Sequence, residues 1–276
     1  MALIIQTNVA SLQSQKNLNR TQAALSSSFN KLSSGFRINT AADDAAGLAI
    51  SESMKSQIRS YSVAERNAND AISMAQTAEG SLGEVTDILG RMRQLAMQGA
   101  NGSLGVDDRS YLATEFSQLQ SEVKRIQNST KFNGTALVTA ATASVKFQVG
   151  LSNVANDQVT VVFGGVKLTS LLSTGTKVSG ATAGNSQAAL GTIDAALKTV
   201  STARAKFGAA MNRLDITTQT LQTTRLNLSA ANSRIRDVDV AEETATMSRN
   251  QVLAQAGAAV LAQANQSPQL AINLLR

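Results

Sequence analysis

The second half of the chain carries a long heptad repeat of apolar residues. The repeat begins at Leu190 and continues to Ile235 in alternating steps of three and four residues. This spacing places apolar side chains along one stripe of a helix and is typical of a coiled-coil seam. At a rise of about 1.5 Å per residue, the predicted helix is about 70 Å long. The seam residues are Leu190, Ile193, Leu197, Val200, Phe207, Met211, Leu214, Leu221 and Leu228, with Arg204, Thr218 and Arg225 as interruptions.

The first half predicts two further helices that can pack on this seam. Apolar residues keep a similar spacing from Met54 to Ala96 and again from Leu112 to Ile126. The segment between them, residues 99–105, is rich in glycine and has the composition of a loop. We therefore predict a mainly α fold, built as a long antiparallel helical hairpin or coiled-coil bundle.

The middle of the chain has a different pattern. Val159–Phe163 and Val166–Thr169 predict two short strands around a turn at Gly164 and Gly165. The flanking stretches, residues 135–144 and 173–187, are rich in Thr, Ala, Ser and Gly and are interpreted as connectors. We expect a small β-hairpin region here, too small to form an independent sandwich.

The two ends predict a pair of weakly amphipathic helices. Residues 1–42 and 244–276 together contain six basic residues and no Asp or Glu, which accounts for the net charge of +6. Their apolar stripes are narrow, and isolated helices of this kind are marginal in water. We expect them to become ordered when packed against each other and against neighbouring copies. The predicted contact residues are Ile5, Val9, Leu12, Leu18, Leu25, Leu32, Leu253, Val260, Leu270 and Leu274.

The composition argues against an enzyme and against a metal or cofactor site. The chain has no Cys and no His, which removes disulfides, thiolate ligands, Ser-His-Asp triads and the usual general base. The adjacent acidic pairs at residues 43–44, 107–108 and 242–243 fit helix caps and solvated turns. The basic residues are spread singly without aromatic neighbours, so nucleic-acid binding is not favoured.

The sequence contains neither a membrane-spanning run nor the features of a cleaved secretory signal. No stretch of 18 apolar residues occurs, so no membrane insertion is expected. The start of the chain lacks a basic region followed by a long apolar segment and a small-residue cleavage site. These observations leave two alternatives, a cytoplasmic protein or one that is exported by another route.

Several motifs, in order, make this chain resemble the bacterial flagellins. The resemblance covers about residues 1–138 and 186–276, and it leaves the centre unmatched. The motifs are Asn8–Leu12, Lys31–Asn39, Ala41–Ile50, Thr130–Gly134, Ser233–Asp239 and Pro268–Arg276.

The resemblance implies a structural subunit that polymerises into the flagellar filament. It implies an inner terminal coiled-coil domain of residues 1–40 and 236–276. An outer helical rod would comprise residues 41–185 and 186–235, with residues 135–185 as its β-hairpin and surface-exposed part. A hook-filament junction protein is the alternative within the class, and a basic nucleic-acid-binding coiled-coil protein is a more distant one. A flagellin with a metalloprotease centre is excluded because the chain has no His.

The resemblance also implies partners and a location. The principal partner is the chain itself, in a helical homopolymer that is secreted through the flagellar type III route and is extracellular. An export chaperone, the filament cap and the hook-junction proteins are further implied partners. Recognition by the innate receptor TLR5 is implied for an exposed helix patch of Arg91, Arg93, Leu95 and Glu122, from which this chain departs at Gly90 and Gln94. In the polymer this patch would lie between subunits, so its first role would be assembly.

Overall fold

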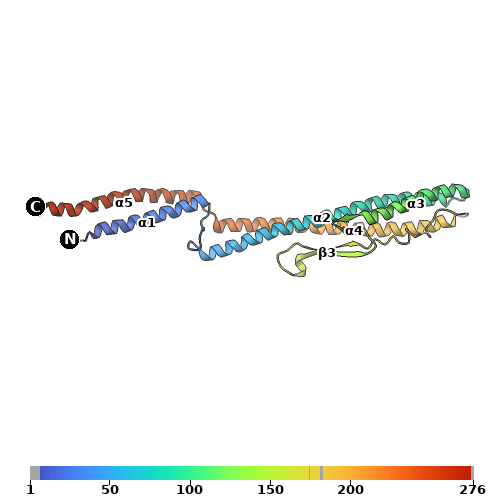
Figure 1. The fold of residues 1–276 in the computed structure, drawn as a ribbon, viewed down its shortest axis with the longest axis horizontal. Coiled ribbons are helices and arrows are strands. Elements are labelled where there is room, and N and C mark those ends of the chain that lie inside the picture. Colours follow the sequence, from blue (N-terminus) through green and yellow to red (C-terminus); the bar gives the residue numbers. More distant parts are fainter. Residues whose placement is uncertain (1–6, 174, 181–182, 275–276) are drawn as a thin grey trace. The chain divides into compact units, whose positions relative to one another are not determined.

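The computed structural model describes residues 7–173, 175–180 and 183–274. The helices are α1 (Val9–Ser34), α2 (Ala45–Gly99), α3 (Val106–Ser129), α4 (Gly184–Arg236) and α5 (Val240–Leu274). The short strands are β1 (Lys131–Phe132), β2 (Thr135–Ala136), β3 (Thr142–Gln148) and β4 (Gln158–Gly164), with a 3-10 turn at Ala155–Asp157. The predicted mainly α fold with a small β region in mid-chain is confirmed (Figure 1).

The chain divides into two compact units. One comprises Met1–Ile58 and Leu226–Arg276, and the other comprises Arg59–Arg225. The long helices α2 and α4 contribute residues to both units. The predicted boundaries at residues 40 and 236 coincide with the breaks between helices. The first turns of α2 and the last turns of α4 nevertheless belong to the same unit as α1 and α5.

The unit Arg59–Arg225 is a helical bundle with a continuous apolar core. Figure 1 shows α2, α3 and α4 running side by side in this unit. Leu82 and Leu89 of α2 meet Phe116 and Val123 of α3 in this core, each at most 1% exposed. The helices are long because the only proline of the chain is Pro268, so nothing interrupts the hydrogen-bond ladder of α2, α3 or α4.

The apolar seam of α4 has a buried row and an edge row. Ile193, Val200, Phe207, Leu214 and Leu221 are buried, and the rings of Phe207 and Phe163 lie 5.5 Å apart. The other row is half-buried and consists of Leu190, Leu197, Met211 and Leu228, the last of which belongs to the other unit. One heptad position therefore points into the bundle and the other lies at its margin.

The three polar interruptions predicted for the seam all have partners. Arg204 forms an ion pair with Glu79 of α2 at 2.6 Å, and Arg225 forms one with Glu65 at 3.5 Å. Thr218 is buried, and its hydroxyl donates to the Leu214 carbonyl at 2.9 Å. These three side chains are thus satisfied, whereas Asn232, the seam position between Leu228 and Ile235, has a buried Oδ1 without a hydrogen-bond partner among the described residues.

The β region differs from the predicted hairpin in its pairing. The strand that pairs with β4 is β3, in antiparallel register from Thr142 opposite Gly164 to Gln148 opposite Gln158. The predicted strand Val166–Thr169 is wrong, and so is the assignment of residues 142–144 to a connector. Gly164 and Gly165 do have left-handed φ angles of 73°, but the segment after them turns toward the helices. Burial of Val166 and Leu168 in the core replaces the pairing with β4.

Side-chain amides attach this non-helical segment to the helices. Gln127 of α3 donates from Nε2 to the carbonyls of Val138 (3.3 Å) and Val166 (3.0 Å). Gln120 donates to the carbonyls of Leu171 and Thr176, and Asn67 of α2 donates to that of Gln148. These amides therefore satisfy carbonyl groups in a segment where regular strand pairing ends.

The turn between α2 and α3 is closed by a buried arginine and a glycine. Arg109 is 4% exposed and donates to the carbonyls of Gly99 (3.2 Å) and Asn101 (3.1 Å). A cation at the end of α2 complements the negative end of its dipole. A Cβ at Gly99 would collide with the side chains of Val178 and Ser186, so this position requires glycine.

In the other unit, the two breaks between helices are hydrogen-bonded to each other. Gly35 ends α1 with a left-handed φ of 73°, and its carbonyl accepts from the Val238 amide at 3.1 Å. The Arg236 guanidinium lies 4.5 Å above the Phe36 ring and donates to Glu52 at 2.6 Å. These contacts connect the ends of α1 and α4 to the first turns of α2.

Asp43 caps the loop that enters α2. Its carboxylate accepts from the amides of Asn39 (3.1 Å) and Thr40 (2.8 Å) and from the Thr40 hydroxyl. The Thr40 and Asn39 backbone hydrogen bonds hold the pKa of Asp43 below its ordinary value, because they stabilise the ionised form. The interpretation of the 43–44 pair as capping residues agrees with this geometry.

Candidate functional site

The candidate site is the antiparallel pair of helices α1 and α5. At one end, Asn8 donates from Nδ2 to the Ala264 carbonyl at 2.8 Å, and the Ser11 hydroxyl donates to Asn265 Oδ1 at 2.6 Å. At the other end, Lys31 lies 3.8 Å from the carboxylate of Glu243. The first turns of α1 therefore lie beside the last turns of α5 (Figure 1).

The faces that α1 and α5 turn toward each other are narrow. On α1 the half-buried apolar residues include Leu18, Leu25 and Leu32. On α5 the half-buried positions include Ala254 and Leu261. Gly257 lies between these two positions, and a Cβ built there would lie 3.4 Å from the nearest Leu18 methyl group. Small residues on α5 thus allow a close approach but bury little apolar area.

Large apolar side chains remain exposed on both helices. On α1, Val9 is 65% and Leu12 is 58% exposed. On α5, Val252, Leu253 and Val260 are 64%, 50% and 57% exposed. Burying a side chain of this size stabilises a structure by about 1.5–3 kcal/mol, so their exposure leaves a substantial driving force unused. Several large apolar side chains exposed on one helix pair are typical of an interaction surface.

The predicted contact residues therefore fall into two groups. Leu18, Leu25 and Leu32 are half-buried beside the partner helix, whereas Val9, Leu12, Leu253 and Val260 are at least half exposed, the last two at the edge of the contact with α1. Sequence reasoning placed Leu253 and Val260 on the main apolar stripe of α5. In the structure, the half-buried positions of α5 beside α1 are one residue further along, at 254, 257 and 261. Ile5 and the side chains of Leu270 and Leu274 lie outside the described residues.

A shallow groove runs between the two helices. Its volume is about 260 Å³. Its apolar lining comes from Leu18, Leu253, Ala256 and Val260, with Ser14, Asn17 and Thr21 along one side. Residues 1–42 and 244–276 contain no carboxylate, so no acidic side chain from these segments borders the groove. The groove thus offers apolar contact edged by hydroxyl and amide groups.

The predicted receptor patch does not form one exposed surface. Leu95 is 1% exposed and belongs to the core, so its inclusion in a surface patch is wrong. Arg91 and Arg93 are exposed and form ion pairs with Glu115 of α3 (2.7 Å) and Asp194 of α4 (2.8 Å). The hydrogen bonds that both guanidinium groups donate to these carboxylates raise their pKa. Because the spacing of Leu95 also fits the α2 stripe, its burial follows from the same periodicity that predicted the helix.

Glu122 lies on α3 and is engaged locally. Arg125, one turn further along the helix, donates to both carboxylate oxygens of Glu122 at 2.8 and 2.6 Å. These hydrogen bonds lower the pKa of Glu122 and raise that of Arg125. No hydrogen bond or ion pair among the described residues joins Glu122 to Arg91 or Arg93.

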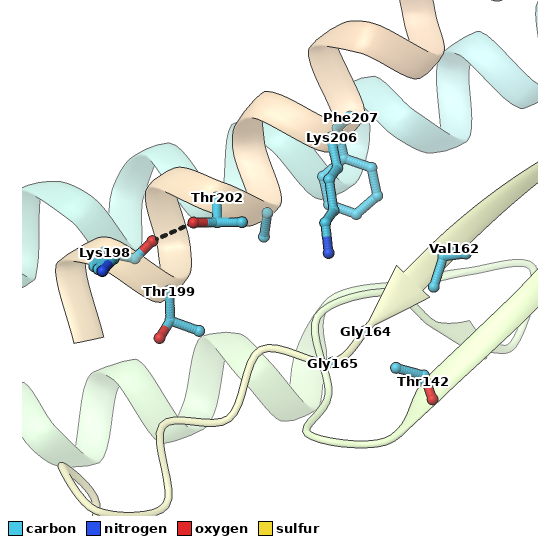
Figure 2. A pocket seen from close by; sticks show the side chains of 10 residues that line it. Thr142, Val162, Gly164, Gly165, Lys198, Thr199, Thr202, Lys206 and Phe207 are labelled. Atoms are coloured by element: carbon cyan, nitrogen blue, oxygen red, sulfur yellow. Dashed lines mark hydrogen bonds between the residues drawn. The ribbon is translucent and has the colours of Figure 1, made fainter. Parts of the chain in front are cut away.

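A second cavity lies between α4 and the β3–β4 hairpin, within the unit Arg59–Arg225. Its volume is about 380 Å³, and Figure 2 shows Lys206 extending from α4 toward the hairpin. The walls include Lys198 and Thr199 of α4, and Thr142 and Val162 of the hairpin. Sequence reasoning missed this cavity because its walls come from segments that are far apart in the chain.

The described residues carry no grouping typical of a metal centre. Over residues 7–173, 175–180 and 183–274, no cluster of three or more His, Cys, Asp or Glu side chains could hold an ion. None of the helices in this part of the chain has the length and apolar character needed to span a membrane.

The structure has a bundle of long helices and a terminal helix pair whose apolar side chains are only partly buried. These features are typical of structural subunits that associate with copies of themselves. Two family models match the sequence: the bacterial flagellin N-terminal helical region over residues 5–142 and the C-terminal helical region over residues 190–275. The chain belongs to the bacterial flagellin family.

Relatives over the whole length support the same conclusion. A flagellin of Halalkalibacterium halodurans is 42% identical over 278 residues, which cover 99% of this chain and 100% of the relative. The flagellar filament 33 kDa core protein of Treponema phagedenis is 40% identical over 291 residues, with the same coverage. The chain is therefore a structural subunit of the bacterial flagellar filament, and it self-associates there.

Solved structures add a likeness of fold. A Vibrio parahaemolyticus protein provisionally described as flagellar hook-associated has a TM-score of 0.60 and 18% sequence identity. The likeness covers 71% of this chain and 100% of that protein. At this identity the match shows a shared fold alone, so it does not favour the hook-filament junction alternative.

Proposed function

We propose that this filament subunit polymerises through the outer surface of the α1–α5 pair. The observation that carries the proposal is the exposure of Val9, Leu12, Val252, Leu253 and Val260, each at least half exposed on helices whose mutual contact is narrow. Contacts between copies would remove these side chains from water. Because every copy has the same groove, one favourable contact is repeated along the whole polymer.

The charge pattern supports close packing of identical copies. A surface that meets its own copies brings like charges together, and repeated carboxylates would repel one another. The segments that form most of this pair have no Asp or Glu, and their polar residues are largely amides and hydroxyls. Such groups supply hydrogen bonds between copies without adding repulsive charge.

The architecture that follows has an inner and an outer part. Residues 1–40 and 236–276 would form the inner part of the filament wall, and residues 41–185 and 186–235 the outer rod. The mid-chain segment 135–185 would be exposed on the surface. We further propose that the chain has no enzymatic activity, since it lacks Cys and His.

The family resemblance supports export and assembly partners as part of this proposal. The chain would leave the cell unfolded through the flagellar type III route, guided by an export chaperone. Outside the cell it would assemble between hook-junction proteins and the filament cap. Recognition by the receptor TLR5 would depend on the exposed residues Arg91, Arg93 and Glu122, without Leu95.

A pair of matched variants tests the assembly surface. The double variant Leu253→Asp/Val260→Asp places carboxylates in the groove, whereas Gln251→Asp/Gln255→Asp adds the same charge at exposed polar positions of α5. We expect the first variant to raise the critical concentration for seeded polymerisation at least about tenfold, and more than the second. Sedimentation of monomer mixed with filament fragments measures this concentration, and circular dichroism checks helix content. If wild-type monomer does not elongate the seeds, self-association is refuted. If the groove variant elongates the seeds as well as its matched control does, the choice of surface is wrong.

A further inference from the structure

We propose that the cavity between α4 and the β3–β4 hairpin receives an acidic helix face from a neighbouring copy, formed by Glu84 and Asp87 of α2. This inference rests on the proposed function, because it specifies a second contact in the same polymer. The cavity and the acidic pair both belong to the unit Arg59–Arg225, so each copy carries both halves of the contact.

The cavity is cationic at its rim and apolar at its base. Lys198 and Lys206 are exposed, and neither forms an ion pair among the described residues. The Thr202 hydroxyl donates to the Lys198 carbonyl (Figure 2), and the Thr199 hydroxyl donates to the Ala195 carbonyl, so their hydrogens are already engaged within α4. The two ammonium groups are therefore the charged donors that the cavity offers to an incoming group.

The lining is suited to a side chain that carries both apolar and acidic character. Val162 is 48% exposed on the hairpin wall, while Ala203 and Phe207 form part of the α4 wall. None of the lining residues is acidic. An aliphatic stem that ends in a carboxylate would contact the apolar wall and reach the lysines at the rim.

The complementary acidic face lies on α2. Glu84 and Asp87 are exposed, lie one turn apart on the same helix and form no ion pair within the described part of the chain. Their charged neighbours along α2 are paired: Glu79 binds Arg204, and Arg91 binds Glu115. The two lysines of the cavity and these two carboxylates thus have no ion-pair partner within the described part of the subunit, and each set is available for an opposite charge.

Helical polymers require contacts between two different surfaces of the subunit. When a surface of one copy meets a different surface of the next, the association builds a filament if the rotation between copies does not close a ring. Lys198 and Lys206 are eight residues apart on α4, about 12 Å along the axis. Their long side chains can converge on a carboxylate pair that spans a single helical turn. The contact would lie at the surface and would weaken at high ionic strength.

Reversal and restoration of charge test this pairing. We expect Lys198→Glu/Lys206→Glu and, separately, Glu84→Lys/Asp87→Lys each to raise the critical concentration for seeded polymerisation at least about tenfold. The chain that carries all four substitutions restores opposite charges and should return to within about threefold of wild type. Lys124→Glu/Arg213→Glu changes net charge as much as the first reversal at exposed, unpaired positions, and serves as its control.

The outcomes separate this proposal from the one on which it rests. If the reversals polymerise like wild type, or if the fourfold variant is no better than either reversal, the pairing is overturned while self-association stands. If the cavity instead binds small anions, millimolar inorganic sulfate should shift the amide resonances of Thr199 and Gly165 in the monomer. In that case the Lys198→Glu/Lys206→Glu variant should polymerise like wild type, and this result would also overturn the pairing. Failure of the wild-type chain to elongate seeds would refute the proposed function itself.

Discussion

Gln127 illustrates how one side chain can determine the path of a segment. It is 7% exposed, and a single amide nitrogen donates to the carbonyls of Val138 and Val166. These residues lie on opposite sides of the β3–β4 hairpin in sequence. The amide therefore holds the entry and the exit of the hairpin against α3, a role that an apolar side chain of similar size cannot fill.

Gln127→Ala should destabilise the monomer by about 1–3 kcal/mol, because it leaves two carbonyl groups without a donor in a buried place. Urea unfolding followed by circular dichroism measures the change. Asn128→Ala is the matched control, since Asn128 is the next residue of α3 and is exposed. Equal unfolding midpoints for the two variants would show that water or a rearranged backbone satisfies both carbonyls.

The sequence could not reveal this role. Asn67, Gln120 and Gln127 occur in helical patterns where an amide usually faces solvent, and no local signal distinguishes them. Their importance arises from the mid-chain segment, where carbonyls such as those of Val166 and Leu171 have no strand partner. The burial of Leu95 was foreseeable at the same scale, since it continues the core stripe of α2.

At the scale of elements, an apolar spacing that persists over many turns predicts secondary structure and burial far better than a short apolar run does. Over many turns the spacing of α4 predicts both a long helix and an inward row, and residues 193, 200, 207, 214 and 221 are all buried. The predicted β-hairpin rested on two glycines and a few Val residues. That signal located a β-rich segment correctly but did not identify the partner strand, which depends on core packing. On α5, alanine and glycine weaken the pattern, and the predicted stripe was displaced by one residue.

Leu214 tests the inward row of the seam. It is fully buried in the middle of α4, so Leu214→Asp should destabilise the unit Arg59–Arg225 by at least about 3 kcal/mol through a lost apolar contact and a buried, unpaired charge. Thermal melting of the monomer, followed by circular dichroism, measures the effect. Asn212→Asp places the same charge on the exposed face of the same helix and should melt like wild type. An unchanged melting curve for Leu214→Asp would contradict the inward assignment of this row.

At the scale of the whole molecule, the two compact units differ in how they bury apolar surface. The unit Arg59–Arg225 contains the continuous core, with Leu82, Leu89, Phe116, Ile193 and Leu214 all at or near zero exposure. In the other unit, Ser28 is the only residue of α1 described as buried. The core of the unit Arg59–Arg225 is therefore complete within one chain, whereas the helix pair α1–α5 leaves large apolar side chains exposed, which the proposed contacts between copies would bury.

Removal of residues 244–276 separates these two roles. The truncation takes away most of α5, and α1 should then lose its order because an isolated helix of its 26 residues has no partner. Helices α2, α3 and α4, of 55, 24 and 53 residues, should remain because their core lies in the other unit. We expect a monomer that keeps the larger part of its circular dichroism signal in the helix band at about 222 nm, yet does not elongate filament seeds. Loss of nearly all helix on truncation would mean that the bundle depends on the terminal pair, and elongation by the truncated chain would place the polymer contacts elsewhere.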